Sequence, residues 1–404
     1  MNAKKFQNKK ILIGITGGIA AYKACALVSR LKKEGGDVHV MMTENAAHFV
    51  DPMTFETLSG NRCVTDTFDR NHQFNVEHVA LATDADLFLI APATANTIAK
   101  LACGLADNML TTTFLAADCP KMVAPAMNTG MYENPVTQRN LNTLREFGIQ
   151  VIEPDEGYLA CGVTGSGRMP EAEELYAYVE RELLREKDLA GKRILVTAGA
   201  TRESMDPVRF ITNHSSGKMG YAIAKECMLR GADVVVVRAH TTADAPAFCH
   251  YIDAVSAADM YREVMRRSMA ADAVFMAAAV SDYTPKDVAE QKMKKSDEDL
   301  SLELKRTVDI LARLGETKRE GQFICGFSME TQNLVENSAR KLVKKHADMI
   351  VANNLMEQGA GFGTDTNRVT LITKHGAERL ELMSKEEVAR EIVDRAREAL
   401  VSSN

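Results

Sequence analysis

KILIGITGGIAAYK, at residues 10–23, is the stretch that decides the fold of the first half of the chain. Its opening run, Lys10–Thr16, is apolar and β-branched and predicts a strand, while the amphipathic stretch Ala20–Glu34 predicts a helix. The pair Gly17-Gly18 between them lets the backbone approach a ligand closely, and the N–H groups at a helix start can bind an anion. A glycine pair also serves as a plain tight turn, so this stretch alone leaves phosphate binding open.

The alternation of strand and helix continues through the first half of the chain. Two segments, DLFLIAPATANT at 86–97 and PAMNTGM at 125–131, again run from a strand into a small polar turn. The further strands are predicted at Val38–Met42, Asp86–Ala91, Lys121–Ala124 and Gln150–Ile152, and the further helices at Ala95–Ala102 and Pro135–Phe147. This order is typical of βαβ units around a parallel sheet, which binds ligands at the carboxyl ends of its strands.

A second α/β layout begins after the charged, helical stretch Glu171–Lys187. Its first strand, Arg193–Thr197, leads through a long loop into a helix at Gly217–Arg230, and Lys286–Lys295 is expected to be an exposed loop. The other predicted elements are strands at Asp233–Val237, Ala273–Met276, Phe323–Gly326, Met349–Asn353 and Val369–Thr373, and a final helix at Lys385–Leu400. We therefore expect two doubly wound, Rossmann- or flavodoxin-like α/β domains, at residues 1–189 and 190–404.

Composition supports two domains and excludes several classes of protein. The 404 residues, 46% of them hydrophobic, are enough for two cores. The net charge of −6 argues against a nucleic-acid partner, and no run of 18–20 apolar residues predicts a membrane span. The eight cysteines form no CxxC pair and the start of the chain has no signal-peptide core, so we expect a cytoplasmic protein.

The motifs of the first half resemble the flavin-containing cysteine decarboxylases, specifically phosphopantothenoylcysteine decarboxylase, over most of residues 10–170. The resemblance implies an FMN cofactor and three catalytic residues. His78, in NVEHV, is the base, Asn128 meets the substrate carboxylate, and Cys161, in the glycine-rich flap CGVTGSGRM, is the proton donor. The implied flavin contacts are Gly17, Gly18, Thr94, Asn96 and Asp107, although many relatives carry serine where this chain has Gly18.

The three implied catalytic residues also have simpler interpretations. A lone histidine often caps a surface helix, an asparagine can satisfy turn backbone groups, and a thiol in a loop is usually inert. The proposed chemistry explains why they occur together, because an unactivated carboxylate needs an electron sink before carbon dioxide can leave. A flavin supplies it by oxidising the terminal CH₂–SH group to a thioaldehyde.

The segment of the second half that is most informative about function is AGATRESMDPVRFITNHSSGKMG, at residues 198–220. Its glycines, serines and helix start can bind phosphate, and Arg209, Asn213 and Lys218 can orient anions. A dehydrogenase turn is the alternative, but no intact GxGxxG is present. The segment resembles phosphopantothenate–cysteine ligase, and the resemblance continues through AAAVSDY at 277–283, KMKK at 292–295, GFSME at 326–330 and VANN at 351–354.

This second resemblance implies a CTP-dependent amide ligase acting on 4′-phosphopantothenate and L-cysteine, with Mg²⁺ on the triphosphate. The implied catalytic residues are Asn213, which orients an acyl-cytidylate, and Lys292, which is needed to form it. The implied nucleotide contacts are Arg209, Ala278, Asp282, Lys292, Lys294, Lys295 and Phe327. No metal ligand can be assigned from the sequence. A solvated basic loop is the simpler interpretation of the lysines.

Together the two halves resemble the bacterial fused proteins of coenzyme A biosynthesis, which carry both activities in one chain. That resemblance also implies a homo-oligomer, with a dodecamer as the expected assembly. Two other classes stay open: a regulatory flavoprotein that reuses the decarboxylase fold, and an NAD(P)-dependent oxidoreductase. The first would lack turnover and the second would not require CTP.

Overall fold

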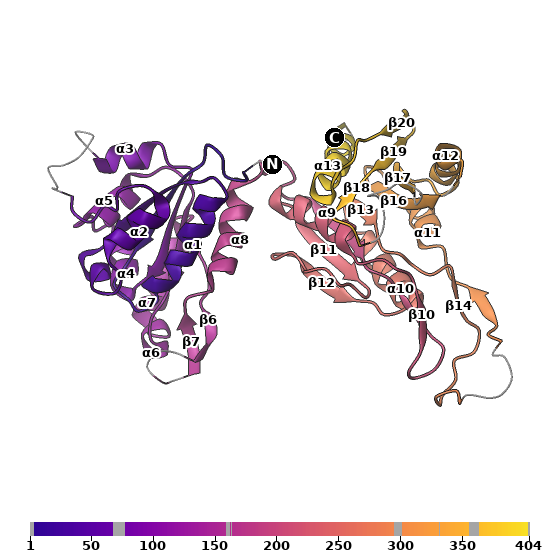
Figure 1. Ribbon diagram of the computed structural model, residues 1–404, viewed down its shortest axis with the longest axis horizontal. Helices are drawn as coiled ribbons and strands as arrows, with labels where there is room; N and C mark the ends of the chain where they lie inside the picture. The colour runs from indigo at the N-terminus through magenta and orange to yellow at the C-terminus, as the bar shows by residue number, and fades with distance from the viewer. Residues whose placement is uncertain are drawn as a thin grey trace. The chain divides into compact units, whose positions relative to one another are not determined.

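The computed structural model describes residues 4–67, 77–158, 162, 164–294, 301–330, 332–354 and 363–402. The chain forms two compact units, Met1–Arg185 and Glu186–Asn404 (Figure 1). The boundary expected from the sequence, between residues 189 and 190, lies a few residues after this observed division. Each unit has its own sheet and core, and each is described separately below.

Unit 1 contains a five-stranded sheet, in the residues that the structure describes, with the order β2-β1-β3-β4-β5 and every pair parallel. The strands are β1 (Lys10–Ile15), β2 (Asp37–Met42), β3 (Leu87–Ala93), β4 (Lys121–Pro125) and β5 (Gln150–Val151). This order is the flavodoxin-like form of the doubly wound fold, in which the chain crosses from one side of β1 to the other after β2. The predicted fold class is confirmed.

Helices cover both faces of this sheet (Figure 1). Because side chains of a strand alternate between its faces, Ile11 and Ile13 join one core and Leu12 joins the other. The first core includes α1 (Ala21–Lys33), α2 (Pro52–Ser59) and α8 (Ala172–Leu183), and the second includes α3 (Glu77–Thr83), α4 (Ala95–Cys103), α5 (Met109–Ala116) and α7 (Pro135–Glu146). The smaller elements of the unit are η1 (Glu44–His48), α6 (Thr129–Tyr132) and the hairpin β6 (Asp155–Tyr158)–β7 (Thr164–Arg168).

Unit 2 contains an eight-stranded sheet in its described part, with the order β12-β11-β8-β13-β16-β17-β19-β20. The parallel strands are β8 (Arg193–Ala198), β11 (Asp233–Arg238), β12 (His250–Asp253), β13 (Ala273–Met276), β16 (Phe323–Glu330) and β17 (Met349–Asn354). An antiparallel edge follows, made by β19 (Val369–Thr373) and β20 (Gly376–Arg379). Its core faces α10 (Ala257–Ser268), α11 (Ile310–Glu316) and α12 (Leu334–Lys344), while α9 (Lys218–Leu229) packs against α13 (Lys385–Ser402).

Three short two-stranded ribbons extend from unit 2: β9 (Arg202–Ser204) with β10 (Phe210–Thr212), β14 (Tyr283–Pro285) with β15 (Leu304–Arg306), and β18 (Thr366–Asn367) with β21 (Met383–Ser384). The first ribbon corrects the expectation of a plain loop between β8 and α9. The expected exposed loop after residue 285 is confirmed over its described part, since residues 286–294 form neither helix nor strand.

Arg230, at the end of α9, joins the beginning and the end of unit 2. Its buried guanidinium donates two hydrogen bonds to Asp188, at 2.7 and 2.5 Å, and one to Asp394 on α13, at 2.5 Å. Arg397 on the same helix pairs with Asp188 at 2.9 Å. In the part of the chain that the structure covers, no helix is both long enough and apolar enough to cross a bilayer.

Candidate active sites

A cavity of about 750 Å³ opens in unit 1 at the carboxyl ends of β1, β3 and β4. Its lining residues come from the turns after these strands and from the hairpin β6–β7, and include Gly17, Gly18, Thr94, Met127, Asn128 and Arg168. Ligand pockets commonly measure about 300–1,000 Å³, so this one can take a molecule of flavin size. Its place at the strand ends is the expected one for a doubly wound sheet.

The turn after β1 is fixed by its neighbours. Thr16 is buried, and its hydroxyl donates to the Pro92 carbonyl at 2.8 Å and accepts from the Thr94 N–H at 3.0 Å. A Cβ at Gly17 would lie 2.5 Å from Cβ of Asn45, so only glycine fits there. At Gly18 the nearest atom to such a Cβ is Cγ2 of Thr94, 3.7 Å away, so that position has room for a side chain.

The helix start beside this turn is suited to an anion. Within the described residues, no side chain caps α1, and its first turn has no acidic residue. The Ala21 and Lys23 N–H groups donate to the Gly18 and Ala20 carbonyls, both at 3.0 Å, so the helix dipole and the remaining backbone of the turn are what favour a phosphate here.

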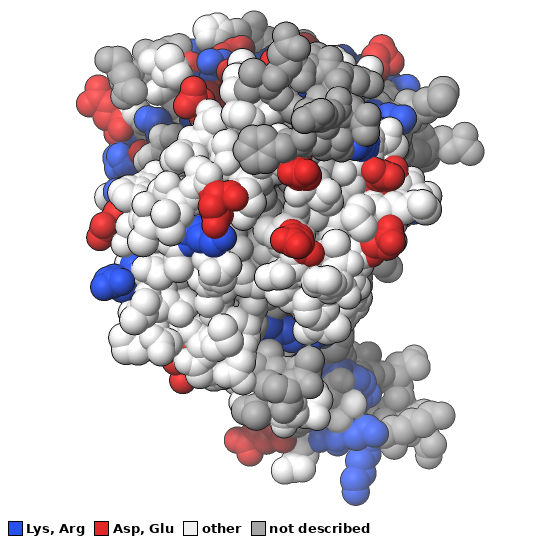
Figure 2. Space-filling model, turned by 90° about the vertical axis from the view of Figure 1, so that its left-hand side faces the viewer, with Lys and Arg blue, Asp and Glu red and all other residues white. Residues whose placement is uncertain are grey.

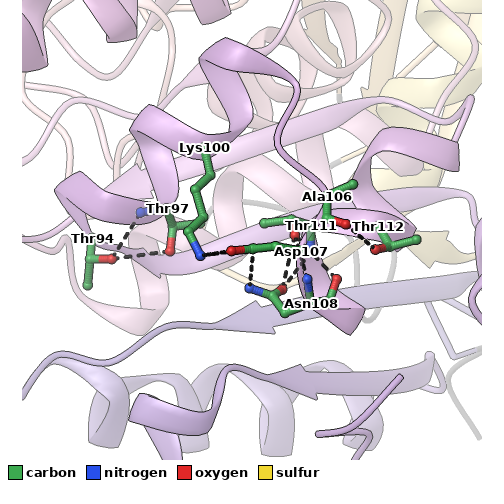
Figure 3. Close-up of polar contacts among 8 residues, drawn as sticks. All are labelled: Thr94, Thr97, Lys100, Ala106, Asp107, Asn108, Thr111 and Thr112. Carbon is green, nitrogen blue, oxygen red and sulfur yellow. Dashed lines mark hydrogen bonds and ion pairs between the residues drawn. The ribbon is translucent and has the colours of Figure 1, made fainter. Parts of the chain in front are cut away.

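Polar side chains order the segment from α4 to α5, which Figure 3 shows. Thr94 caps α4 by accepting from the Thr97 N–H, and Asn108 caps α5 through a reciprocal capping box with Thr111. Asp107 accepts two hydrogen bonds from the Lys100 ammonium, at 2.9 and 2.6 Å, and these lower the pKa of its carboxyl group.

Asp107 and Asn96 are exposed and are not among the residues that line the cavity in the described structure. Of the five flavin contacts implied by the resemblance, the structure therefore brings Gly17, Gly18 and Thr94 to the cavity and leaves the other two outside its lining.

Asn128 lies in the loop after β4, where its side chain accepts from the Gly130 N–H at 2.9 Å. The loop is joined to β7, since the Met127 N–H donates to the Gly167 carbonyl at 3.0 Å. Gly167 has a φ of 126°, and a Cβ there would lie 2.3 Å from the Met127 carbonyl oxygen. The hairpin β6–β7, which belongs to the predicted flap, is thus held against the loop that carries Asn128.

The other two predicted catalytic residues of unit 1 are not brought to this cavity by the described structure. His78 is partly buried on α3 and does not belong to the lining described above. Cys161 lies outside the described residues, three positions before β7 begins at Thr164.

Two cations at the cavity were not predicted. Lys23 on α1 donates to the Met169 carbonyl at 3.0 Å and to Glu171 at 2.8 Å, and Arg168 also pairs with Glu171. The hydrogen bond from Lys23 is the largest cause of a lowered pKa at Glu171. Their positive charge favours an anionic ligand. Arg168 stands in the flap motif itself, which is the signal that could have identified it.

Unit 2 has a cavity of about 440 Å³ at the carboxyl ends of β13 and β16. Of the predicted nucleotide contacts, Ala278, Asp282 and Phe327 line it. The segment Arg306–Leu311 forms another wall and adds a cation that the sequence did not reveal. Asn213 lies close by, since its side-chain amide donates to the carbonyl of Ala279 at 3.2 Å.

Glycines again shape the turn before the helix in unit 2. Gly199 and Gly217 have φ values of 88° and 83°, and a Cβ at Gly217 would lie 3.4 Å from the Gly199 nitrogen. The two ends of the excursion from 199 to 217 therefore touch. Lys218, the first residue of α9, is paired with Asp365 at 2.6 Å.

Arg209 is held by protein groups in this structure, because its guanidinium contacts Asp206 at 2.6 Å and the Met293 carbonyl at 2.6 Å. Lys292 and Lys294 are exposed on either side of Met293, and Lys295 lies outside the described residues. A search of the described side chains finds no group of three or more His, Cys, Asp or Glu that could hold a metal ion.

These features define a two-unit α/β enzyme with a cavity at the carboxyl ends of the strands in each unit. A family model described as flavoprotein matches residues 2–184, and one described as the DNA/pantothenate metabolism flavoprotein C-terminal domain matches residues 189–400. The chain is 48% identical over 390 residues to coenzyme A biosynthesis bifunctional protein CoaBC of Bacillus subtilis (strain 168), covering 96% of both chains. It is 41% identical to the protein of the same name from Haemophilus influenzae, covering 96% of this chain and 97% of the other.

A solved structure of the C-terminal domain of coenzyme A biosynthesis bifunctional protein CoaBC is 43% identical, with a TM-score of 0.47, and covers 54% of this chain and 100% of its own. The chain belongs to the family of bifunctional coenzyme A biosynthesis proteins. It is an enzyme that combines a flavoprotein decarboxylase with a ligase.

Proposed function

We propose that unit 2 joins 4′-phosphopantothenate to L-cysteine with CTP, and that unit 1 decarboxylates the resulting 4′-phosphopantothenoylcysteine to 4′-phosphopantetheine with FMN. The observation that carries this proposal is a cavity at the carboxyl ends of the strands in each unit. The unit 1 cavity contains Gly17, Gly18, Thr94 and Asn128, and the unit 2 cavity contains Ala278, Asp282 and Phe327. Full-length relatives with a bifunctional coenzyme A name support the same assignment.

In unit 1, the chain's own groups bind and orient the reactants. The start of α1 and the Gly17-Gly18 turn would hold the FMN phosphate, while Lys23 and Arg168 favour anionic groups in the cavity. When bound, FMN supplies a reversible two-electron oxidation that creates an electron sink β to the substrate carboxylate. The Asn128 amide orients that carboxylate, His78 takes the initial proton, and Cys161 returns one at the end.

In unit 2, the carboxylate of 4′-phosphopantothenate attacks the α-phosphorus of CTP, and the bond to pyrophosphate breaks. The amine of cysteine then attacks the acyl-cytidylate carbonyl, CMP leaves, and an amide forms. The Lys292 ammonium stabilises negative charge that develops on the transferring phosphate, and Asn213 orients the intermediate. Lys294 and Lys295 add positive charge for the triphosphate, and Mg²⁺ would neutralise further negative charge there when bound.

We also propose a cytoplasmic homo-oligomer, in which unit 1 contributes an interface. Figure 2 shows the face of unit 1 that carries α3 and α5, where separate acidic side chains and a basic one stand across the centre and the surface below them is uncharged. Val79, Leu105 and Leu115 belong to these elements or to the loop beside them and are 45–60% exposed. Exposed apolar side chains on such a face favour association. Light scattering of the purified chain tests this, with the dodecamer as the expected mass and a monomer as the contrary result.

Mass spectrometry of the reaction products tests the two activities together. The chain is incubated with 4′-phosphopantothenate, cysteine, Mg²⁺, FMN and CTP, with ATP replacing CTP in a parallel reaction. We expect 4′-phosphopantetheine only with CTP. Accumulation of phosphopantothenoylcysteine would leave the ligase assignment and contradict the decarboxylase assignment. FMN binding without turnover would indicate a regulatory flavoprotein, and NAD(P) binding without a CTP requirement would indicate an oxidoreductase.

A further inference from the structure

Asp206 is a fully buried carboxylate of unit 2 that the proposed mechanism does not use. Its side chain has no exposed surface, although it follows Met205 and precedes Pro207 in a turn between β9 and β10. Oδ1 accepts from the N–H groups of Val208 at 2.8 Å and Arg209 at 2.7 Å. Burial of a charge is costly unless donors surround it, so this arrangement needs a reason beyond the turn itself.

The other oxygen of Asp206 reaches a distant segment of the chain. Oδ2 accepts from the Met293 N–H at 3.1 Å and from the Arg209 guanidinium at 2.9 and 2.6 Å. The same guanidinium donates to the Met293 carbonyl at 2.6 Å. The peptide groups on both sides of Met293 are therefore held, one by the carboxylate and one by the guanidinium.

A second contact holds the same segment. The Ala289 N–H donates to the Met205 carbonyl at 3.0 Å, so the turn that precedes Asp206 also binds the loop four residues before Met293. In the described part of this loop, residues 286–294, there is no helix or strand to set its course. Its position depends on these contacts with the 205–209 turn.

We propose that Asp206, acting with Arg209, is a positioning residue that fixes Lys292 and Lys294 at the ligase site. This inference rests on the proposed function, because it takes the role of Lys292 from it. The two lysines are the immediate neighbours of Met293, whose backbone is clamped. The ribbon strand β10 runs from the same turn to Asn213, so one carboxylate links the segments that carry both proposed catalytic residues of unit 2.

The charge of Asp206 matters as well as its shape. Burial opposes its ionisation, but hydrogen bonds from the Val208 N–H, from Arg209 and from the Met293 N–H outweigh this effect and lower its pKa. The carboxylate therefore stays charged throughout the working range of pH and keeps both Arg209 and the loop in place. An asparagine would keep one acceptor oxygen but would not attract the guanidinium with a charge.

The test compares Asp206→Ala, Asp206→Asn and Asp259→Asn. Pyrophosphate release from CTP and 4′-phosphopantothenate, measured without cysteine, isolates the first half-reaction. We expect Asp206→Ala to lower kcat by about 100-fold with little change in KM for CTP, because a small displacement of a catalytic group has an effect of this order. Asp206→Asn recovers part of the loss. Asp259, which caps α10 away from the cavity, is the matched control and keeps wild-type activity.

Combination with Lys292→Gln distinguishes positioning from a general loss of structure. If Asp206 acts through Lys292, the double variant is no slower than Lys292→Gln alone, since groups that work as a unit are not additive. Additive losses, a raised KM with unchanged kcat, or wild-type activity of Asp206→Ala would each overturn the inference.

Limited trypsin digestion gives a readout that does not depend on turnover. Release of the loop in Asp206→Ala is expected to speed cleavage after Lys292 and Lys294, with no such increase in Asp259→Asn. Equal cleavage in wild type and Asp206→Ala would overturn the positioning role. A wild-type chain that forms no CTP-dependent product would instead refute the proposed function, while the digestion would still decide whether Asp206 holds the loop.

Discussion

The two units use the same opening, a strand, a glycine turn and a helix, but place their chemistry differently. In unit 1 the chain passes from β1 to α1 through residues 16–20, and the groups that surround the cavity come from later strand ends and from the hairpin β6–β7. In unit 2 the excursion at 199–217 separates β8 from α9 and itself carries Asp206, Arg209 and Asn213. In both units glycines shape the turn between the first strand and its helix, while the proposed functional residues lie around that turn in unit 1 and within it in unit 2.

The largest effect should come from separating the two activities. Asn128→Ala is expected to slow decarboxylation by about 10³-fold, because loss of one well-placed donor has an effect of this order. Ligation continues, so phosphopantothenoylcysteine accumulates. Asn213→Ala gives the reverse result, with decarboxylation of supplied phosphopantothenoylcysteine intact. Mass spectrometry follows both products, and loss of both activities in either variant would show that the two sites are not independent.

A stability difference between the units should follow from Arg230. Arg230→Ala removes a buried guanidinium and its hydrogen bonds to two partly exposed carboxylates, which we expect to cost unit 2 about 1.5–3 kcal/mol. Arg262→Ala is the control, because Arg262 is 62% exposed and its ion pairs contribute little. Chemical denaturation monitored separately for each unit measures the change. An equal loss in unit 1 would contradict the division of the chain into two cores.

The same contact gives unit 2 a dependence on pH. The hydrogen bond from Arg230 is the main cause of the lowered pKa of Asp188. A carboxyl group with a lowered pKa in the folded state stabilises the fold above its ordinary pKa of about 3.9, and this contribution is lost as the pH falls through the lowered value. The free energy of unfolding of unit 2 is expected to fall more steeply below pH 4 in wild type than in Arg230→Ala. Parallel curves would contradict this.

The glycine turn of unit 1 offers a matched pair of substitutions. Gly17→Ala forces a contact with Asn45 and is expected to destabilise unit 1 by about 1–3 kcal/mol and to weaken FMN binding. Gly18→Ser fits without a clash and adds a hydroxyl at the turn, so FMN binding is expected to be equal or stronger. Flavin fluorescence titration measures both, and weaker binding to Gly18→Ser would contradict the proposed orientation of the phosphate.

The smallest effect is expected at Asp107. Its ion pair with Lys100 is exposed, so Asp107→Asn should change the stability of unit 1 by well under about 1 kcal/mol. A flavin contact predicts weaker FMN binding in the same variant, whereas a purely structural ion pair predicts none. Fluorescence titration of Asp107→Asn beside Lys100→Met distinguishes these, because only the first removes the carboxylate.

Local sequence patterns predicted the strands and helices that form the two sheets. They did not predict contacts between residues that are far apart in the sequence. The strands Ala273–Met276 and Val369–Thr373 appear with the predicted bounds because they are compact apolar runs. The ribbon β9–β10 was missed, since its strands are short and mostly polar, and a turn that contains Pro207 separates them. In the sequence Asp206 is an ordinary turn residue. Its contact with Met293 could not be predicted, because only the fold brings the two residues together. Lys23 likewise meets Glu171 only in the fold, whereas Arg168 lies three residues before Glu171.

The ion pairs of Arg230 have a consequence for how such a chain can arise. Asp188 stands at the start of unit 2 and Asp394 on its last helix, so the two ends of the unit meet at one guanidinium. Ends that lie close together can be joined or extended with a small entropic cost. Unit 2 therefore has the geometry of a domain that can be fused to another chain without a change in its own fold. A circular permutant with a short peptide between its old ends is expected to keep the same sheet.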